Sequence, residues 1–143
     1  MARPFQYEEK YHPTNWVTDR SIDFLRRRDP YRLFFLMAFY LRPHPPFDAP
    51  AWYFDSLTGP VDPELIRQAQ VGYYACITHL DHQIGRLIMA LTEHELQNDT
   101  IILFTSDLGE ELCDHHYFRK SMPYEGSTRI PMILSGNPAL LGL

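Results

Sequence analysis

Acidic residues gather directly after an apolar run in the last third of the chain. Asp107 stands at the head of this cluster, and further carboxylates follow at Glu110, Glu111 and Asp114. Hard cations such as Ca2+ and Mg2+ bind oxygen ligands that come from several chain segments. The cluster therefore has the composition of one part of a metal site, and a solvated acidic loop explains it at least as well.

Histidine and lysine side chains near this cluster, and on an upstream loop, could contact an anion. His115 and His116 are adjacent, which is a poorer chelating arrangement than the i, i+4 spacing on a helix. Lys120 could pair with an anionic oxygen of a substrate. His44 stands between two prolines, which stiffen the backbone and lower the entropy lost in holding a donor in place. For all of them, an exposed or packed structural role remains an open alternative.

Apolar runs that alternate with helical patterns predict the scaffold for these residues. We expect helices from about Thr14 or Asn15 to Arg28 and from Asp62 to about Leu96, and strands at 33–41, 100–105 and 130–134. Uninterrupted apolar strands are typical of a parallel sheet covered by helices. The sequence thus predicts an α/β fold with a mostly parallel sheet in one domain, residues 1–143. In such sheets functional residues lie beyond the carboxyl ends of the strands, where the His44 and Asp107 loops begin.

Composition argues against several classes of protein. The formal net charge of −5 gives no basic footprint for nucleic acid, and no apolar run reaches the roughly 20 residues of a membrane span. Arg26, Arg27 and Arg28 are flanked by Asp23 and Asp29, as is typical of a solvated helix end. Two separated cysteines do not make a disulfide framework. The start lacks a secretory signal, so we expect a cytoplasmic chain, and the apolar end suggests a truncated domain.

Four motifs, in order along the chain, together resemble the sulfatase family. Residues 43–46, PHPP, are similar to P-H-x-P, and residues 74–85 are similar to Y-A-x-I-x-x-L-D-x-x-I-G. Residues 98–110, NDTIILFTSDLGE, resemble the D-N-T-I-I…T-S-D-H-G-E strand and turn. Residues 114–120 and 123–131 resemble its continuation, G-D-H…K…Y-E-G-S-x-R-I-P. The resemblance covers nearly the whole chain and points to bacterial arylsulfatases and choline sulfatases.

This resemblance implies an alkaline-phosphatase-like α/β fold, with this chain as the C-terminal part of a catalytic domain that hydrolyses sulfate esters. In the family a formylglycine hydrate attacks sulfur while a calcium-type ion (Ca2+ or Mg2+) and cationic side chains hold the sulfate oxygens. Matched by position, Asp107 would be a metal ligand. His44 and Lys120 would contact the sulfate and the leaving group, and His115 would line the substrate pocket. Preorganised positive groups of this kind stabilise an anionic transition state.

Three departures separate the chain from the family pattern. Leu108 stands where the family has His or Asn, and an aliphatic side chain cannot ligate a cation. The formylglycine motif, C/S-x-P/A-x-R, is absent: neither Cys76 nor Cys113 begins it, and after Ser121 the arginine position holds Glu125. The family's N-terminal Asp-Asp metal pair also has no counterpart here.

We therefore expect a fragment of a sulfatase-type enzyme whose substrate is a small-molecule sulfate ester, with little turnover by this chain alone. Calcium should raise its melting temperature little, because at most Asp107 remains of the ligand set. Neither nucleic acid nor a membrane is an expected partner. One alternative is a phosphoesterase or phosphonate hydrolase of the same superfamily. Another is a non-catalytic module completed by a partner, either a second copy or a missing N-terminal segment.

Overall fold

The computed structural model describes residues 3–44, 47, 64–114, 119–120 and 122–142. Contacts between Cα atoms divide the chain into two compact units, Met1–His94 and Glu95–Leu143. Each unit is described by itself below. Among the described residues, no helix combines the length and the apolar character that crossing a membrane requires.

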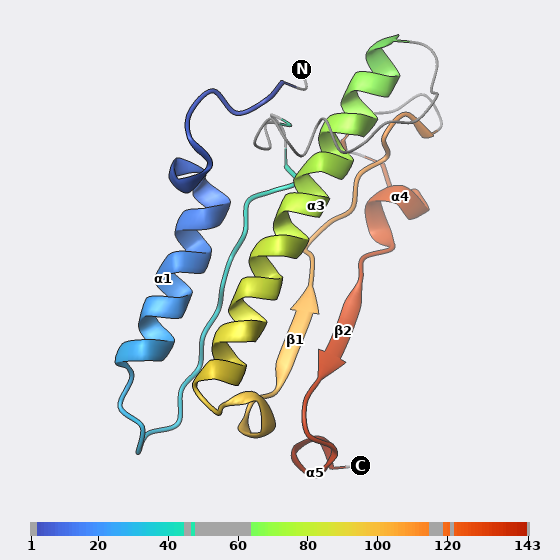
Figure 1. The fold of residues 1–143 in the computed structure, drawn as a ribbon. Helices are drawn as coiled ribbons and strands as arrows, with labels where there is room; N and C mark the ends of the chain where they lie inside the picture. The colour runs from blue at the N-terminus through green and yellow to red at the C-terminus, as the bar shows by residue number, and fades with distance from the viewer. Residues whose placement is uncertain (1–2, 45–46, 48–63, 115–118, 121, 143) are drawn as a thin grey trace. The chain divides into compact units, whose positions relative to one another are not determined.

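The described part of the first unit contains a short 3-10 turn and two long helices (Figure 1). The turn η1 spans Glu9–Tyr11, and helices α1 and α3 span Pro13–Arg27 and Glu64–Glu93. Helix α1 begins with a proline in its first turn, where the missing N–H costs nothing. Both helices were predicted, and α3 ends three residues before the expected Leu96. Residues 62–63, the expected start of that helix, lie outside the described residues.

The interface between α1 and α3 is more polar than the sequence pattern suggests. Four of the five buried side chains of α1 carry hydrogen-bonding groups: Thr14, Asn15, Thr18 and Ser21, with Leu25 as the apolar member. The hydroxyls of Thr18 and Ser21 donate to backbone carbonyls of their own helix, which satisfies them without a partner from α3. At the exposed margin of the interface, Arg86 of α3 pairs with Asp19 of α1 at 2.7 Å.

Two fully buried histidines join η1, α1 and α3. His12 and His79 are 0% and 1% exposed, and their rings meet edge to face at 4.6 Å between centroids. His79 Nε2 donates to Asn15 Oδ1 at 2.6 Å, while His12 Nδ1 accepts the N–H of Thr14 at the start of α1. Burial lowers the pKa of His79 from 6.5 to about 3, and the nearby His12 and His82 add to the shift. His79 is therefore a neutral hydrogen-bond donor in the folded chain.

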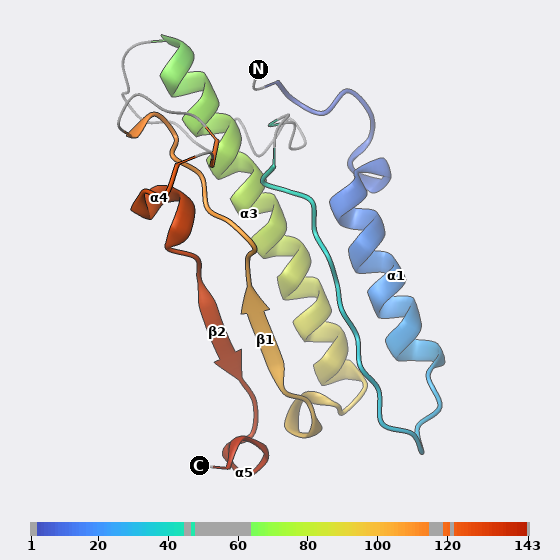
Figure 2. The same ribbon diagram turned by 180° about the vertical axis from the view of Figure 1, so that it is seen from behind.

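The apolar run 33–41 does not form the doubly buried strand that the sequence predicts. It is extended, but it pairs with no strand among the described residues (Figure 2). Its even-numbered side chains face α1, where Phe34 contacts Phe24 and Tyr40 Oη lies 2.9 Å from Thr18 Oγ1. Its odd-numbered side chains are exposed, from 104% for Leu33 to 57% for Leu41. An all-apolar strand needs cover on two faces, and the described part of this unit covers one.

The second unit is built on a pair of antiparallel strands. Strand β1 spans Ile102–Thr105 and β2 spans Met132–Ser135, and their register pairs Ile102 with Ser135 and Thr105 with Met132. Both strands were predicted to within two residues. Their antiparallel pairing differs from the expected parallel sheet, because the intervening segment turns the chain back along β1. Parallel strands would need a crossover connection, usually a long helix.

The described residues of this unit also include three single-turn helices. They are η2 (Gln97–Asp99) before β1, α4 (Glu125–Thr128) before β2, and α5 (Pro138–Leu141) after it. Asn137 caps α5 by accepting the N–H of Ala139, and Gly142 ends the helix in the left-handed conformation that glycine favours. One turn is too short to carry a 3.6-residue apolar repeat, so the sequence pattern predicted none of the three.

The buried histidine makes the stability of the first unit depend on pH. Folding holds the pKa of His79 at about 3, below its unfolded value of 6.5, so unfolded chains take up a proton that folded chains do not. The contribution of His79 to the free energy of unfolding is therefore fully present above about pH 6.5. It is lost as the pH falls toward 3, by up to about 1.4 kcal/mol per pH unit. In urea unfolding at a series of pH values, His79→Gln should flatten this slope, and His94→Gln serves as the control. Equal slopes in wild type and His79→Gln would contradict the assignment.

Candidate functional site

Asp107 stands in a tight turn immediately after β1. The hydroxyl of Ser106 donates to the carbonyl of Leu108 at 2.7 Å, and the Leu108 N–H donates to Asp107 Oδ1 at 2.9 Å. These two bonds fix the turn locally and occupy one of the two carboxylate oxygens. The Asp107 side chain is exposed, and the apolar Leu108 side chain beside it is 43% exposed. The turn thus presents one carboxylate oxygen to solvent, next to a side chain that has no donor or acceptor.

The segment that follows Asp107 lies unusually close to α4. The Gly109 N–H donates to the Ser127 carbonyl at 2.8 Å. A Cβ atom placed on Gly109 would lie 2.0 Å from the carbonyl oxygen of Gly126, a backbone atom that cannot yield as a side chain does. A Cβ on Gly126 would in turn lie 2.9 Å from Glu111 Oε2. Two glycines therefore permit a backbone contact that positions the Asp107 turn.

Two consecutive glutamates connect this turn to Arg119. Glu110 Oε1 accepts the Arg119 N–H, and the Glu111 N–H donates to the Arg119 carbonyl at 3.0 Å. The Glu111 side chain is 1% exposed, and its Oε1 accepts the hydroxyl of Ser127 at 2.5 Å. We refer to Gly109, Glu110, Glu111, Arg119 and Ser127 as the loop clamp.

Lys120 follows directly after the loop clamp. Its side chain is partly buried, and within the described residues it makes neither an ion pair nor a hydrogen bond. An ammonium group without a carboxylate partner keeps its charge available for an anionic ligand. Asp107 and Lys120, two of the predicted site residues, are thus attached to opposite ends of one hydrogen-bonded assembly in the second unit.

The other predicted contacts lie elsewhere in the chain. His44 belongs to the first unit, where its side chain is exposed and its N–H donates to the Leu41 carbonyl at 3.1 Å. It follows a cis peptide bond between Arg42 and Pro43. His115 lies outside the described residues, so its role in substrate binding stays a prediction.

The described residues do not form a metal site by themselves. They include no group of three His, Cys, Asp or Glu side chains that could hold a metal ion. Asp107 offers one open oxygen and Leu108 offers none, whereas Ca2+ takes six to eight oxygen ligands. Glu110 and Glu111, which the sequence placed in a metal-like cluster, each use one side-chain oxygen, Oε1, as a hydrogen-bond acceptor. Asp107 is therefore at most one ligand of a larger set.

Residues 2–141 match the family model described as Sulfatase. The chain belongs to the sulfatase family. It is 42% identical to an arylsulfatase of Clostridium perfringens (strain 13 / Type A), over 94% of this chain and 34% of that protein. It is 29% identical to the multifunctional alkaline phosphatase superfamily protein PehA of Trinickia caryophylli, over 92% of this chain and 34% of that protein. As a member of the sulfatases, the chain spans about a third of the length of these relatives.

Solved structures confirm the expected alkaline-phosphatase-like α/β fold of this sulfatase chain. The protein yidJ of Bacteroides fragilis, assigned as a sulfatase, matches 86% of this chain and 30% of its own with a TM-score of 0.78 at 30% identity. Phosphonate monoester hydrolase of Agrobacterium radiobacter matches 96% of this chain and 37% of its own with a TM-score of 0.83. At 23% identity the latter shows the fold alone. Sulfatases are generally metal-dependent enzymes.

Sequence reasoning missed the residues that hold the sulfatase loop in place. The Tyr-Glu-Gly-Ser motif at 124–127 was noted as a family feature, but nothing in its letters shows that Ser127 binds Glu111 or that Gly126 faces that carboxylate. The available signal was the pair of glycines, one in each of two neighbouring polar motifs. Glycines at such positions can mark a close backbone approach.

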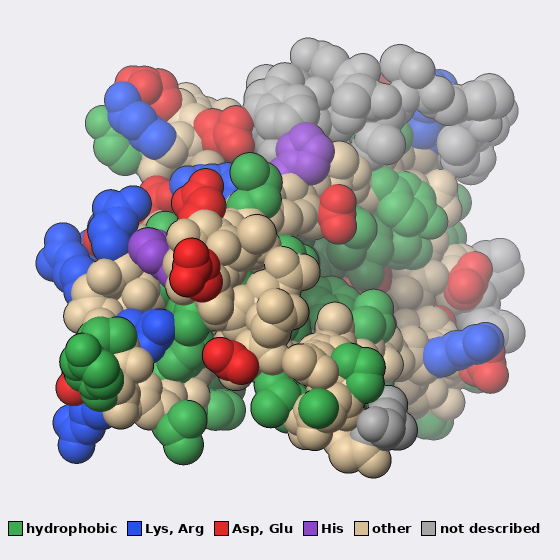
Figure 3. All heavy atoms as spheres, turned by 60° about the horizontal axis from the view of Figure 1, so that its bottom comes forward, with side chains coloured by type: hydrophobic (Ala, Val, Ile, Leu, Met, Phe, Trp, Pro, Cys, Tyr) green, Lys and Arg blue, Asp and Glu red, His purple; other side chains and the backbone are tan. Residues whose placement is uncertain are grey.

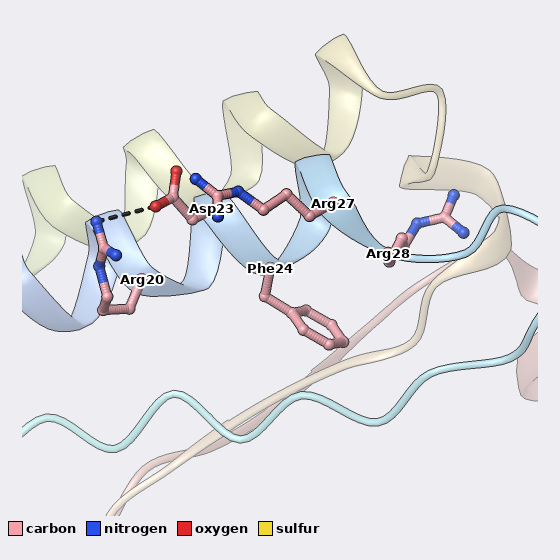
Figure 4. Close-up of a pocket in the computed structure, with 5 residues that line it drawn as sticks. All are labelled: Arg20, Asp23, Phe24, Arg27 and Arg28. Atoms are coloured by element: carbon pink, nitrogen blue, oxygen red, sulfur yellow. Dashed lines mark ion pairs between the residues drawn. The ribbon is translucent and has the colours of Figure 1, made fainter.

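Basic residues also line a groove on α1, but they form no comparable site. Figure 3 shows basic side chains over this helix, which are arginines, with acidic side chains among them. The groove is lined by Arg20, Asp23, Phe24, Arg27 and Arg28. In Figure 4, Arg20 and Arg27 extend toward Asp23, and Arg20 pairs with it at 2.9 Å. Partial charge compensation along a helix end agrees with the solvated surface that the sequence suggested.

Gly109 and Gly126 should tolerate a methyl group much less well than Gly85 of α3. Gly126→Ala is expected to cost about 1–3 kcal/mol of unfolding free energy, and Gly109→Ala more, because each Cβ meets occupied space. Gly85→Ala on α3 is the control, since a Cβ there meets nothing within 4 Å. It should stabilise the chain by about 0.5–1 kcal/mol through helix propensity. Denaturant unfolding of the three variants measures these changes in the free energy of unfolding. Equal changes in all three variants would contradict the close backbone contact.

Proposed function

We propose that this chain is the part of a sulfatase catalytic domain that contacts the sulfate group through Lys120 and supplies Asp107 as one metal ligand. The parent enzyme then hydrolyses small-molecule sulfate esters. One observation carries the proposal: in a chain of the sulfatase family, an ammonium group with no described partner and a partly open carboxylate are held by the same loop clamp.

Lys120 has the chemistry that sulfate transfer requires. Attack at sulfur adds negative charge on the sulfate oxygens and on the leaving oxygen, and a fixed cation nearby stabilises that added charge more than it stabilises the singly charged reactant ester. Lys120 contributes such a charge without first breaking an ion pair. His44, if brought to the same site, can donate a proton or a hydrogen bond to the leaving oxygen.

Asp107 supports metal binding only together with residues beyond those described. The ion we propose is Ca2+, with Mg2+ as the alternative, since both prefer carboxylate oxygens. When bound, it neutralises charge on the sulfate oxygens. The formylglycine motif is absent from this sequence, so we expect the nucleophile to come from another part of the parent enzyme.

A phosphoester or phosphonate substrate is the second candidate. It is favoured by the 29% identity to PehA, a protein described as a multifunctional member of the alkaline phosphatase superfamily. The positive charge at Lys120 suits either anion, so the loop clamp alone does not separate the two. A direct comparison of a sulfate ester and a phosphonate as substrates of one enzyme separates the two candidates.

A chimera tests the proposal. This chain replaces the matching third of the Clostridium perfringens arylsulfatase, in its natural form and with Leu108→Asn, which returns an oxygen donor beside Asp107. We expect metal-dependent hydrolysis of 4-nitrophenyl sulfate, greater for Leu108→Asn, and a loss on the order of 10²-fold in kcat/KM for Lys120→Ala. Lys10→Ala, at an exposed lysine of the first unit, is the matched control.

Three outcomes would contradict this assignment. The first is that neither form of the chimera hydrolyses the sulfate ester. The second is that the chimera prefers a phenyl phosphonate, which favours the second candidate. The third is metal-dependent multiple turnover of the sulfate ester by this chain alone, which would require a nucleophile that the sequence does not provide.

A further inference from the structure

Glu111 is buried in a way that sulfate chemistry does not require. Its side chain is 1% exposed, and Oε2 has no hydrogen-bond partner within the described structure. Burying a carboxylate with an unsatisfied oxygen lowers stability, and it does so more strongly when the group is charged. An apolar residue would avoid that cost. The carboxylate therefore has a task other than filling space.

The contacts of Glu111 identify this task. Its Oε1 accepts the Ser127 hydroxyl at 2.5 Å, which ties it to α4, and its N–H donates to the Arg119 carbonyl at 3.0 Å. The preceding Glu110 accepts the Arg119 N–H through its side chain. Both polar backbone atoms of Arg119 are thus held by adjacent residues, and the next residue in the chain is Lys120.

Three residues in this region have unfavourable backbone conformations, which need surrounding contacts to hold them. Leu112, Cys113 and Arg119 have φ values of 47°, 79° and 74°, the left-handed region that residues with a side chain seldom adopt. Each such conformation is unfavourable for a residue with a side chain and persists where the surroundings hold it. Arg119 is held by the two glutamates. Without them its backbone would relax, and the following side chain would point elsewhere.

We propose that Glu111 is a positioning residue, which, anchored on Ser127, holds the left-handed backbone of Arg119 and thereby sets the direction of Lys120. The inference rests on the proposed function only for the statement that Lys120 meets an anion. The held conformation of Arg119 is independent of it.

The test uses the full chain labelled with 15N, wild type and variants, with inorganic sulfate as the anion probe. Glu111→Ala should shift the amide resonances of Arg119 and Lys120 toward random-coil values while the β1 and β2 amides stay dispersed. Sulfate affinity measured at Lys120 should fall by about tenfold, which equals about 1.4 kcal/mol. Glu111→Gln keeps an acceptor for Ser127 and should restore both signals. Glu125→Ala, at an exposed glutamate paired with Arg129, is the control and should change neither.

The outcomes separate the two proposals. If wild type binds no sulfate at Lys120, the proposed function fails, while the Arg119 and Lys120 resonances still test the positioning role. Unchanged resonances in a folded Glu111→Ala chain would overturn the positioning role whatever the affinity. If Glu111→Ala does not fold, Ser127→Ala decides, because it removes the anchoring hydrogen bond and leaves the carboxylate. Unchanged Arg119 and Lys120 resonances in that variant would also overturn the inference.

Discussion

The contact between the Gly109 backbone and α4 is the constraint on which the candidate site depends. A hydrogen bond of 2.8 Å to Ser127 and the absence of a Cβ at Gly109 and Gly126 bring two backbone segments together. This approach buries Glu111 beside Ser127, and Glu111 in turn fixes Arg119. Asp107 precedes this chain of contacts and Lys120 follows it. The side chains of Asp107 and Lys120, thirteen positions apart in sequence, are thereby positioned by one local structure. The geometry of this structure depends on small residues rather than on a large apolar core.

The parts of the fold that depend on local sequence were predictable. Proline at the start of α1 and the apolar repeat of α3 encode those helices within their own residues, and β1 and β2 lie where apolar runs end at polar turns. The run 33–41 was misjudged because its unbroken apolar sequence indicates burial on two faces, whereas the described part of the first unit covers one. The burial of Glu111 was not predictable either, because it arises from a contact with Ser127 sixteen residues away.

The described residues of this chain supply some, and not all, of the groups that a hydrolytic site needs. The chain matches the Sulfatase model over residues 2–141 yet spans about a third of the relatives it resembles. Asp107 and Lys120 offer one carboxylate and one cation, whereas a hydrolytic centre also needs a nucleophile and a complete ligand set. Leu108 removes a donor beside Asp107. We therefore propose that this chain places charge around a sulfate group and that other residues of the parent enzyme supply the nucleophile.

Hydrogen exchange of individual amides reports on the loop clamp itself, because three of its hydrogen bonds have backbone N–H donors, those of Gly109, Glu111 and Arg119. The account predicts that the Gly109, Glu111 and Arg119 amides of the full chain exchange together and slowly, and that Gly126→Ala speeds all three while the amides at the centre of α3 keep their rates. Fast, independent exchange of these three amides in wild type would contradict it. The Asp107 turn and Lys120 would then have no common support.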